Sequence, residues 1–368
     1  MTKQLIILGT HGIPARHGGF ETFTERMALY LIKHGWQVTV MGQADEADET
    51  SWNDIQCIYL KKRKSGFLKY LDPLLYDMAA IWHTRHMPGI ILTLGYNTAI
   101  FNLLPYFLQR RQIINMDGLE WKRSKYKYWH EKLWLRLNEW VALRIADTCI
   151  ADHPEIASYL LKKSPHTRIK TIAYGADIPR QSEIDIHLLD TFHVKPHEYG
   201  LIIARAEPEN QIADMVHAWK NAKSPHPLLI VGKYDRQNKY QNYVLSLADD
   251  RIKFIGAIYD PKTINTLRSF TAVYLHGHQV GGTNPSLVEA MAAASPIIAH
   301  DNPFNRHTTG HHAFYFELGR DLTLKIDYLL DNRDKAKKLG HQAQEWQKNH
   351  YRWTTILNDY RQLLEHSA

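Results

Sequence analysis

The stretch GTHGIPARHGGFET, Gly9 to Thr22, follows the apolar run Leu5–Leu8 and leads into residues 20–34, which have helical periodicity. Gly35 ends this predicted helix, and residues 36–40 are the next strand. A strand, a glycine loop, a helix and a second strand predict one βαβ unit with parallel strands. The loop amides and the start of the helix can face a phosphate. The spacing matches neither G-x-G-x-x-G nor a Walker A loop, which argues against a standard NAD site or a P-loop.

The rest of the chain alternates strands and helices in the same way. Short apolar strands are predicted at residues 90–94, 112–115, 148–151 and 168–172, and then at 199–204, 227–231, 251–255, 272–276 and 296–300. The chain becomes polar after Tyr174–Pro179, which marks a domain boundary. The sequence therefore predicts an α/β protein with two Rossmann-like domains and a central cleft for ligands. The domains are residues 1–178, joined by a C-terminal helix at 347–368, and residues 196–346.

Composition excludes several classes of protein. Two cysteines in 368 residues cannot form a disulfide framework or a cysteine zinc site, so a reducing cytoplasm is expected. The apolar run at the start is too short for a signal peptide. Residues 90–107 are apolar but interrupted by glycine, asparagine and proline, which predicts a buried strand and a helix instead of a membrane span. We expect a soluble protein.

Positive charge is concentrated in the first half. The chain carries a net charge of +7, and residues 1–180 hold 24 Lys and Arg against 17 Asp and Glu. The cations cluster with aromatic residues, at the run Lys61-Lys62-Arg63-Lys64 and along Trp121–Arg144. This pattern fits a surface that rests on anionic lipid head groups, or an ordinary solvated basic face. Nucleic acid is disfavoured, because no nucleic-acid-binding signature accompanies the charge.

Two loops of the second half carry residues suited to a nucleotide. In ARAEPEN, residues 204–210, the guanidinium of Arg205 matches phosphate oxygens, or forms an ion pair with Glu207 or Glu209. In HGHQVGGTNPSLVEAM, residues 276–291, Pro285 starts a helix that contains Glu289. That carboxylate can accept hydrogen bonds from a ribose diol, or balance the helix dipole.

Together these segments resemble one family over essentially the whole chain. The chain is similar to family 4 retaining glycosyltransferases of the GT-B fold, in particular to the bacterial rhamnosyltransferase-like branch that assembles capsule, O-antigen and other surface polysaccharides. The segments that carry the resemblance are GTHGIPARHGGFET, NMDGLEWKR (115–123), ADHPEIASYL (151–160), residues 174–177, ARAEPEN, GGTNPSLVEAM and the terminal YRWTTILNDYRQLL.

The resemblance implies a role for individual residues. The donor would be bound by Gly18, Gly19, Arg205, Gly282, Thr283, Asn284 and Glu289, and the acceptor by Arg16, His17, Tyr96, Asn97, Asp117 and Glu120. Arg205, Asp117 and Glu289 would serve the reaction itself. Asp117 stands where many relatives carry a histidine, and would orient sugar hydroxyls, unless it is only a turn residue. Two positions depart from the family: Asn210 replaces a lysine, and Gly281 replaces the first of two spaced glutamates.

The function implied by the resemblance is transfer of a sugar, with L-rhamnose from dTDP-L-rhamnose as the best candidate, to a polyprenyl-diphosphate-linked saccharide. UDP- or GDP-hexose donors, a phosphorylase or epimerase, and a non-catalytic nucleotide-sugar-binding protein remain alternatives. We expect no cofactor and no metal, because His276 and His278, like His311 and His312, lack a cluster of carboxylates. The expected location is cytoplasmic, peripheral on the inner face of the cytoplasmic membrane.

Overall fold

A computed structural model describes residues 3–15, 18–62, 71–317 and 319–366. The chain divides into two compact units, which are described separately. The first consists of Met1–Lys122, Tyr126–Ala173 and Trp353–Ala368, and the second of Arg123–Lys125 and Tyr174–Arg352. Of the residues singled out above, Arg16, His17, Arg63 and Lys64 lie outside the described residues.

The first unit contains an eight-stranded sheet in the order β3-β4-β2-β1-β5-β6-β7-β8. All neighbouring strands are parallel except β3, which is antiparallel to β4 at the edge. The bounds are β1 Gln4–Leu8, β2 Gln37–Ala44, β3 Asp48–Trp52, β4 Ile55–Lys61, β5 Ile90–Leu94, β6 Gln112–Asn115, β7 Thr148–Ala151 and β8 Ile169–Thr171. Every residue of β5, β6 and β7 is buried, as expected for parallel strands covered on both faces.

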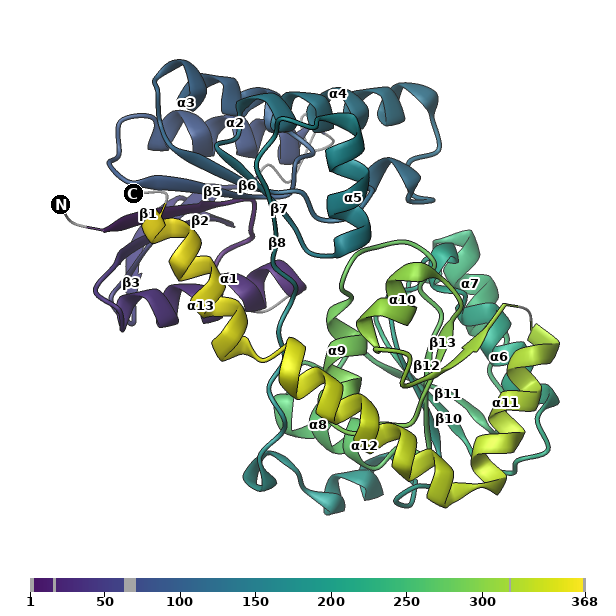
Figure 1. Cartoon of the computed structure of the whole chain (residues 1–368). Coiled ribbons are helices and arrows are strands. Elements are labelled where there is room, and N and C mark those ends of the chain that lie inside the picture. The colour runs from purple at the N-terminus through teal and green to yellow at the C-terminus, as the bar shows by residue number, and fades with distance from the viewer. Residues whose placement is uncertain (1–2, 16–17, 63–70, 318, 367–368) are drawn as a thin grey trace. The chain divides into compact units, whose positions relative to one another are not determined.

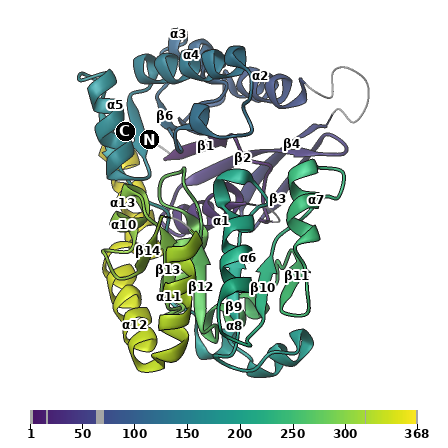
Figure 2. The same ribbon diagram turned by 90° about the vertical axis from the view of Figure 1, so that its right-hand side faces the viewer.

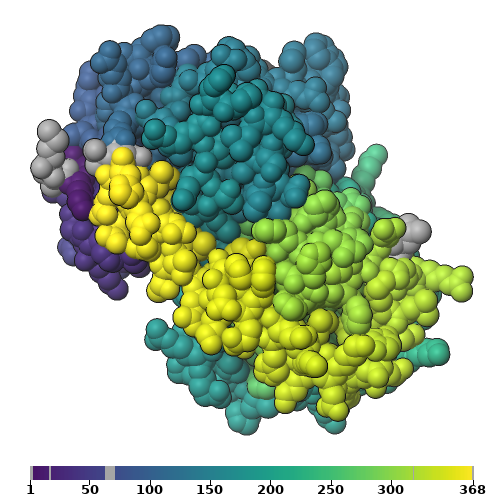
Figure 3. Space-filling model, viewed as in Figure 1, coloured from purple at the N-terminus to yellow at the C-terminus, as the bar shows by residue number. Residues whose placement is uncertain are grey.

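Helices cover both faces of this sheet. Helices α1 (Gly19–Ile32) and α13 (Trp353–His366) lie on one face, where Phe23 packs on Tyr360 with ring centroids 4.8 Å apart. The C-terminal helix, yellow in the space-filling view, lies beside the purple N-terminal segment (Figure 3). Lys3 pairs with Glu365 at 2.7 Å. The opposite face is covered by α2 (Asp72–Thr84), α3 (Leu103–Phe107) and α4 (Trp129–Ile145) (Figures 1 and 2). Helix α5 spans Pro154–Lys163.

The second unit contains a parallel six-stranded sheet in the order β11-β10-β9-β12-β13-β14. Its strands are β9 Gly200–Ile203, β10 Leu228–Val231, β11 Ile252–Gly256, β12 Val273–His276, β13 Ile297–His300 and β14 Phe314–Phe316. Its helices are α6 Ile212–Asn221, α7 Lys239–Ser246, α8 Pro261–Ser269, α9 Pro285–Ala292, α10 Pro303–Thr308, α11 Gly319–Asp331 and α12 Arg333–His350. Helix α6 packs on α11, and α9 packs on α12.

Three helices of this unit begin in the same way, with an Asp or Asn followed by proline. The side chain of Asp260 caps α8 by accepting from the Thr263 amide at 2.8 Å. Asn284 caps α9 and Asn302 caps α10 through the same kind of bond. Proline suits the first helical position, because its amide nitrogen would have no partner there. These short pairs fix where each helix starts after its strand.

The predicted α/β class with parallel sheets is confirmed, and so are the strands at 90–94, 112–115 and 148–151. The strand predicted at 36–40 is longer, and β3, β4 and β14 were not predicted. The carboxylates of Asp48 and Glu49 lie exposed in β3. The segment DETSW is polar throughout, so it carries no alternation that would identify an edge strand.

Candidate active site

The order of strands in the second unit identifies one edge of its sheet as the candidate site. Strand β9 lies between β10 and β12, so the connections from β9 and β12 leave in opposite directions. Ligands of doubly wound sheets bind at the carboxyl ends of strands on either side of such a point. The loops there are residues 204–210, which follow β9, and residues 277–284, which follow β12. Both loops carry residues that the sequence predicts to bind a nucleotide.

These two loops touch each other directly. The Gln279 amide donates to the Glu209 carbonyl at 2.9 Å. A Cβ atom on Gly277 would lie 2.3 Å from the Asn210 carbonyl oxygen, so only glycine allows this approach. The buried Asn210 side chain also donates to the Arg205 carbonyl at 2.8 Å. The Asn210 side chain therefore holds the 204–210 loop together through this hydrogen bond. It offers no positive charge to a ligand, as the family's lysine would.

Positive charge converges on the histidine of the second loop. Arg205 is exposed directly after β9. Burial first, and then the guanidinium groups of Arg205 and Arg123, together lower the pKa of His278 to about 3. Arg123 belongs to the second unit, although it lies far away in the sequence. In the sequence, Arg123 stands at the end of NMDGLEWKR and within the basic cluster Trp121–Arg144, but neither pattern placed it at this site.

Glu289 is held by a cation that no sequence pattern marked. Its Oε2 forms an ion pair with Arg268 of α8, whose side chain is only 6% exposed. The Glu289 side chain is 31% exposed. Arg268 therefore fixes the orientation of the carboxylate while leaving part of it accessible to a ligand.

Gly281 has a backbone conformation that explains its residue type. Its φ is +141°, a region that residues with a side chain rarely adopt, and nothing lies within 4 Å of a Cβ built on it. A glutamate would have the space but not the preferred backbone at this position. The backbone conformation of this loop therefore favours glycine over the glutamate that the family carries at this position.

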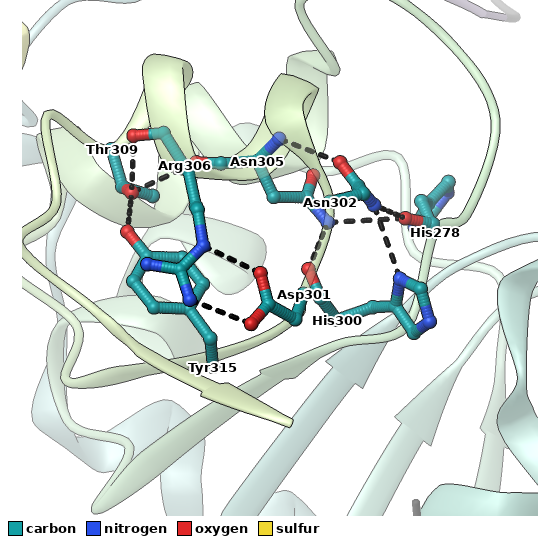
Figure 4. Close-up of polar contacts among 8 residues, drawn as sticks. All are labelled: His278, His300, Asp301, Asn302, Asn305, Arg306, Thr309 and Tyr315. Carbon is teal, nitrogen blue, oxygen red and sulfur yellow. Dashed lines mark hydrogen bonds and ion pairs between the residues drawn. The ribbon is translucent and has the colours of Figure 1, made fainter. Parts of the chain in front are cut away.

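A polar network behind the loop holds it in place, as Figure 4 shows. The side-chain amides of Asn302 and Asn305 both donate to the His278 carbonyl, at 3.0 and 3.1 Å. Asn302 also contacts His300 Nδ1 at 3.1 Å. Arg306 of α10 forms a two-pronged ion pair with Asp301 and lies 4.4 Å over the Tyr315 ring. The start of α10 thus supports the 277–284 loop from its far side.

In the first unit, the glycine loop after β1 is bound by acidic residues of its own helix. The His11 amide donates to Glu21 at 3.1 Å, and the Ala15 amide donates to Glu25 at 2.6 Å. These two amides are therefore occupied by carboxylates and do not face a phosphate. Gly18, with φ +51°, precedes the first turn of α1, where Gly19 is the first residue. A phosphate role for Gly18 and Gly19 remains a prediction.

The predicted acceptor residues of the first unit follow the neighbouring strands β5 and β6. The Glu120 amide donates to the Tyr96 hydroxyl at 3.1 Å, and both side chains are buried. Asp117 is half-buried with φ +48°, and its amide donates to Asn115 at 2.9 Å. The structure thus brings the two loops together. Tyr96 and Glu120 lie inside the unit, whereas Asn97 and Asp117 are partly exposed.

A titratable group beside these loops was not predicted. Asp77 of α2 accepts from the Thr98 hydroxyl at 2.7 Å, next to Asn97. Burial raises the pKa of the Asp77 carboxyl to about 6. A perturbed carboxyl near a loop is a typical feature of functional sites, but no pattern in the sequence marked it.

His276 and His278 do not form part of a metal site in the residues that the structure describes. Their rings stack with centroids 4.3 Å apart, and no group of three or more potential metal ligands occurs within the described ranges. Burial and the neighbouring histidines hold the pKa of His276 well below its usual value. Both rings are therefore neutral near pH 7.

Family comparisons agree with this division of the chain. Residues 2–177 match a domain of unknown function, DUF1972. Residues 191–346 match the family model "Glycosyl transferases group 1". The second unit is thus similar to group 1 glycosyl transferases over residues 191–346. The prediction that the chain is a glycosyltransferase is therefore confirmed, whereas the rhamnosyltransferase branch is not shown. No curated protein matches the chain in sequence.

Solved structures of similar fold cover the whole chain. Sucrose-phosphate synthase from Thermosynechococcus elongatus has a TM-score of 0.82 at 18% identity, covering 99% of this chain and 98% of its own. Anabaena HepE in complex with UDP and glucose has a TM-score of 0.77 at 17% identity, covering 99% and 100%. A trehalose-phosphate synthase from Burkholderia vietnamiensis has a TM-score of 0.75 at 7% identity, covering 100% of both chains. These likenesses confirm the GT-B fold.

Proposed function

We propose that this glycosyltransferase moves a sugar from a nucleoside-diphosphate donor, with dTDP-L-rhamnose as the preferred candidate, to a lipid-linked saccharide in the synthesis of a bacterial surface polysaccharide. The observation that carries the proposal is the meeting of the 204–210 and 277–284 loops at one edge of the second sheet. Arg205 is exposed at this edge, and Glu289 is partly exposed on the helix that follows.

The leaving group of such a donor is a diphosphate, and the site can stabilise its developing charge. Arg205 supplies a guanidinium, and the loop Gly282–Asn284 ends at the start of α9, where amides and the helix dipole favour an anion. We assign the ribose to Glu289, because a carboxylate held by Arg268 can accept from a diol. No metal is required by this arrangement of charges.

The proposed reaction retains the configuration of the transferred sugar. The bond from the anomeric carbon to the diphosphate oxygen breaks, and the acceptor oxygen bonds to the same face of that carbon. The departing phosphate oxygen takes the acceptor proton, so a protein base is not needed. We assign to Asp117 the orientation of a sugar hydroxyl.

The glycine at position 281 favours a donor sugar whose hydroxyl groups make fewer hydrogen bonds to the protein. A glutamate at this position would hydrogen-bond the donor hydroxyls in related enzymes, and glycine offers no such acceptor. A deoxyhexose, which lacks one hydroxyl, is consistent with this loss. The alternative is a UDP-hexose, because the structurally similar HepE was solved with UDP and glucose.

A lipid-linked acceptor would require the enzyme to work at a membrane. Within the described ranges, no helix is long and apolar enough to cross one. The excess of positive charge in residues 1–180 supports attachment to anionic lipid from the cytoplasmic side.

The test is a transfer assay with dTDP-L-rhamnose, UDP-glucose and GDP-mannose, each with and without a polyprenyl-diphosphate saccharide. The proposal expects a glycosylated product and nucleoside diphosphate release that depends on the acceptor, with the highest rate for dTDP-L-rhamnose. Product from another donor would replace the assigned sugar. Binding of donors without any transfer would support a non-catalytic binding protein.

A further inference from the structure

Large apolar side chains are exposed mainly on one part of the first unit. Of the 17 large hydrophobic residues that are exposed in the described parts of the chain, 11 lie between residues 71 and 140. They belong to α2, α3, α4 or the residues beside these helices, which cover one face of the first sheet (Figures 1 and 2). The 11 are Leu71, Met78, Trp82, Tyr106, Phe107, Leu108, Tyr128, Trp129, Leu133, Leu137 and Trp140. Where exposed apolar side chains form a continuous patch, they mark an interaction site.

Helix α4 contributes an apolar stripe directed away from the core. Trp129, Leu133, Leu137 and Trp140 follow one another at intervals of four, four and three residues, which places them on one side of a helix. Their exposed fractions are 76%, 58%, 42% and 55%. The buried side of the same helix contains Leu135, Ala142 and Ile145. Helix α4 is therefore apolar on two sides, and only one of them packs on the unit.

Cations flank this stripe. Lys132, Arg136 and Arg144 are exposed on α4, whereas Glu139 is buried and Glu131 caps the start of the helix. Two arginines lie on exposed tryptophans: Arg144 is 5.3 Å from the Trp140 ring and Arg85 is 4.2 Å from the Trp82 ring. Tryptophan with neighbouring Lys or Arg is the combination favoured at the boundary between lipid head groups and acyl chains.

The cations on α4 make a second copy of this chain an unsuitable partner for the exposed stripe. A second copy of this chain would bring the same cations against each other, since an isologous contact pairs like surfaces. Anionic lipid would instead neutralise the cations and accept the tryptophans. Charge complementarity thus favours a membrane over a dimer.

We propose that the exposed face of α4, together with Trp82 of α2 and Phe107 of α3, is a membrane-docking surface that inserts its tryptophans among anionic lipid head groups. The α4 docking surface, as we name it, rests on the proposed function, because an enzyme with a lipid-linked acceptor must work at a membrane. It differs from an attachment by the Lys61–Lys64 run alone in that it depends on apolar insertion as well as charge.

The experiment is co-sedimentation of the full-length protein with vesicles of phosphatidylglycerol and phosphatidylethanolamine, and with vesicles of phosphatidylcholine. Variant W129S/L133S removes apolar area, and its matched control Y259S/L324S removes exposed area from the second unit, where the two residues are 66% and 62% exposed. Variant K132Q/R144Q removes two cations, and its control K337Q/K338Q removes two exposed cations from α12.

We expect K132Q/R144Q to bind anionic vesicles about 30-fold more weakly at low salt, since each cation near such a surface is worth about fivefold. Variant W129S/L133S should lose at least about tenfold, at low and high salt alike. Both controls should bind as the parent does. Activity on a short water-soluble acceptor should be unchanged in all four, which separates this surface from the proposed function.

Equal vesicle binding by W129S/L133S and the parent would overturn the proposal. So would a dimer, measured by light scattering, that these substitutions dissociate. A shift of the Trp emission of the parent to shorter wavelength on anionic vesicles, weaker in W129S/L133S, would support it. If the vesicle results hold but no donor is transferred, the docking surface stands and the proposed reaction fails.

Discussion

Removing the Glu289 carboxylate should destabilise the protein independently of any effect on catalysis. In Glu289→Ala the guanidinium of Arg268, whose side chain is 6% exposed, loses its carboxylate partner. Breaking a buried pair from one side costs about 3–5 kcal/mol, and partial exposure of Glu289 places this pair near the lower value. For a unit of this size, a loss of about 3 kcal/mol corresponds to a fall in Tm of roughly 6–12 °C.

The assay is thermal unfolding of the full-length protein, followed by circular dichroism. The double variant Arg268→Met/Glu289→Ala should recover most of the loss, because no unpaired charge remains. As a control, Asp321→Ala removes an ion pair with Lys325 in which both side chains are more exposed than Arg268. This change should cost less than about 1 kcal/mol. A Glu289→Ala variant that melts within 2 °C of the parent, on the scale of about 1 kcal/mol, would refute the reasoning.

Three further outcomes follow from the site. Arg205→Ala should lower turnover at least about 100-fold, because the reaction loses one preorganised hydrogen-bond donor. The control Arg320→Ala, at another exposed arginine, should keep the parent rate. Equal rates for the two variants would contradict the assignment of Arg205. Gly277→Ala should weaken nucleotide binding and lower Tm, because its Cβ would lie 2.3 Å from a carbonyl oxygen, whereas Gly319→Ala has open space. The pKa of His278 is lowered from 6.5 to about 3, so its contribution to stability is present above pH 6.5 and is lost as the pH falls towards 3. Urea midpoints at pH 7.5 and 5 should differ less in His278→Asn than in the parent, and an identical difference would argue against a buried neutral ring.

The sequence was sufficient for most of the fold, because buried parallel strands are short uninterrupted apolar runs. Strand β5, residues IILTL, is buried throughout, and it was predicted with its bounds. The Asn-Pro pair at 284–285 likewise predicted the start of α9. Strand β3 was missed because pairing with β4, and not its own composition, makes it a strand.

The candidate site was predictable where it depends on local sequence and not where it depends on packing. Arg205 and Glu289 were found because each follows a strand or opens a helix. Arg268 was missed, since α8 meets α9 only in the folded unit. The carboxylates of Glu21 and Glu25 were read as parts of a helix, but they occupy amides of the glycine loop. Such long-range contacts leave no spacing signal in the sequence.

The most direct test of the account is calorimetric titration of dTDP into the parent, Arg205→Ala and Arg320→Ala. At the carboxyl edge of the second sheet, the proposed diphosphate site, Arg205 would donate charge-assisted hydrogen bonds worth about 1.5–3 kcal/mol. We therefore predict that dTDP binds Arg205→Ala about 10- to 100-fold more weakly than the other two proteins. Equal affinity in all three would contradict the proposed site.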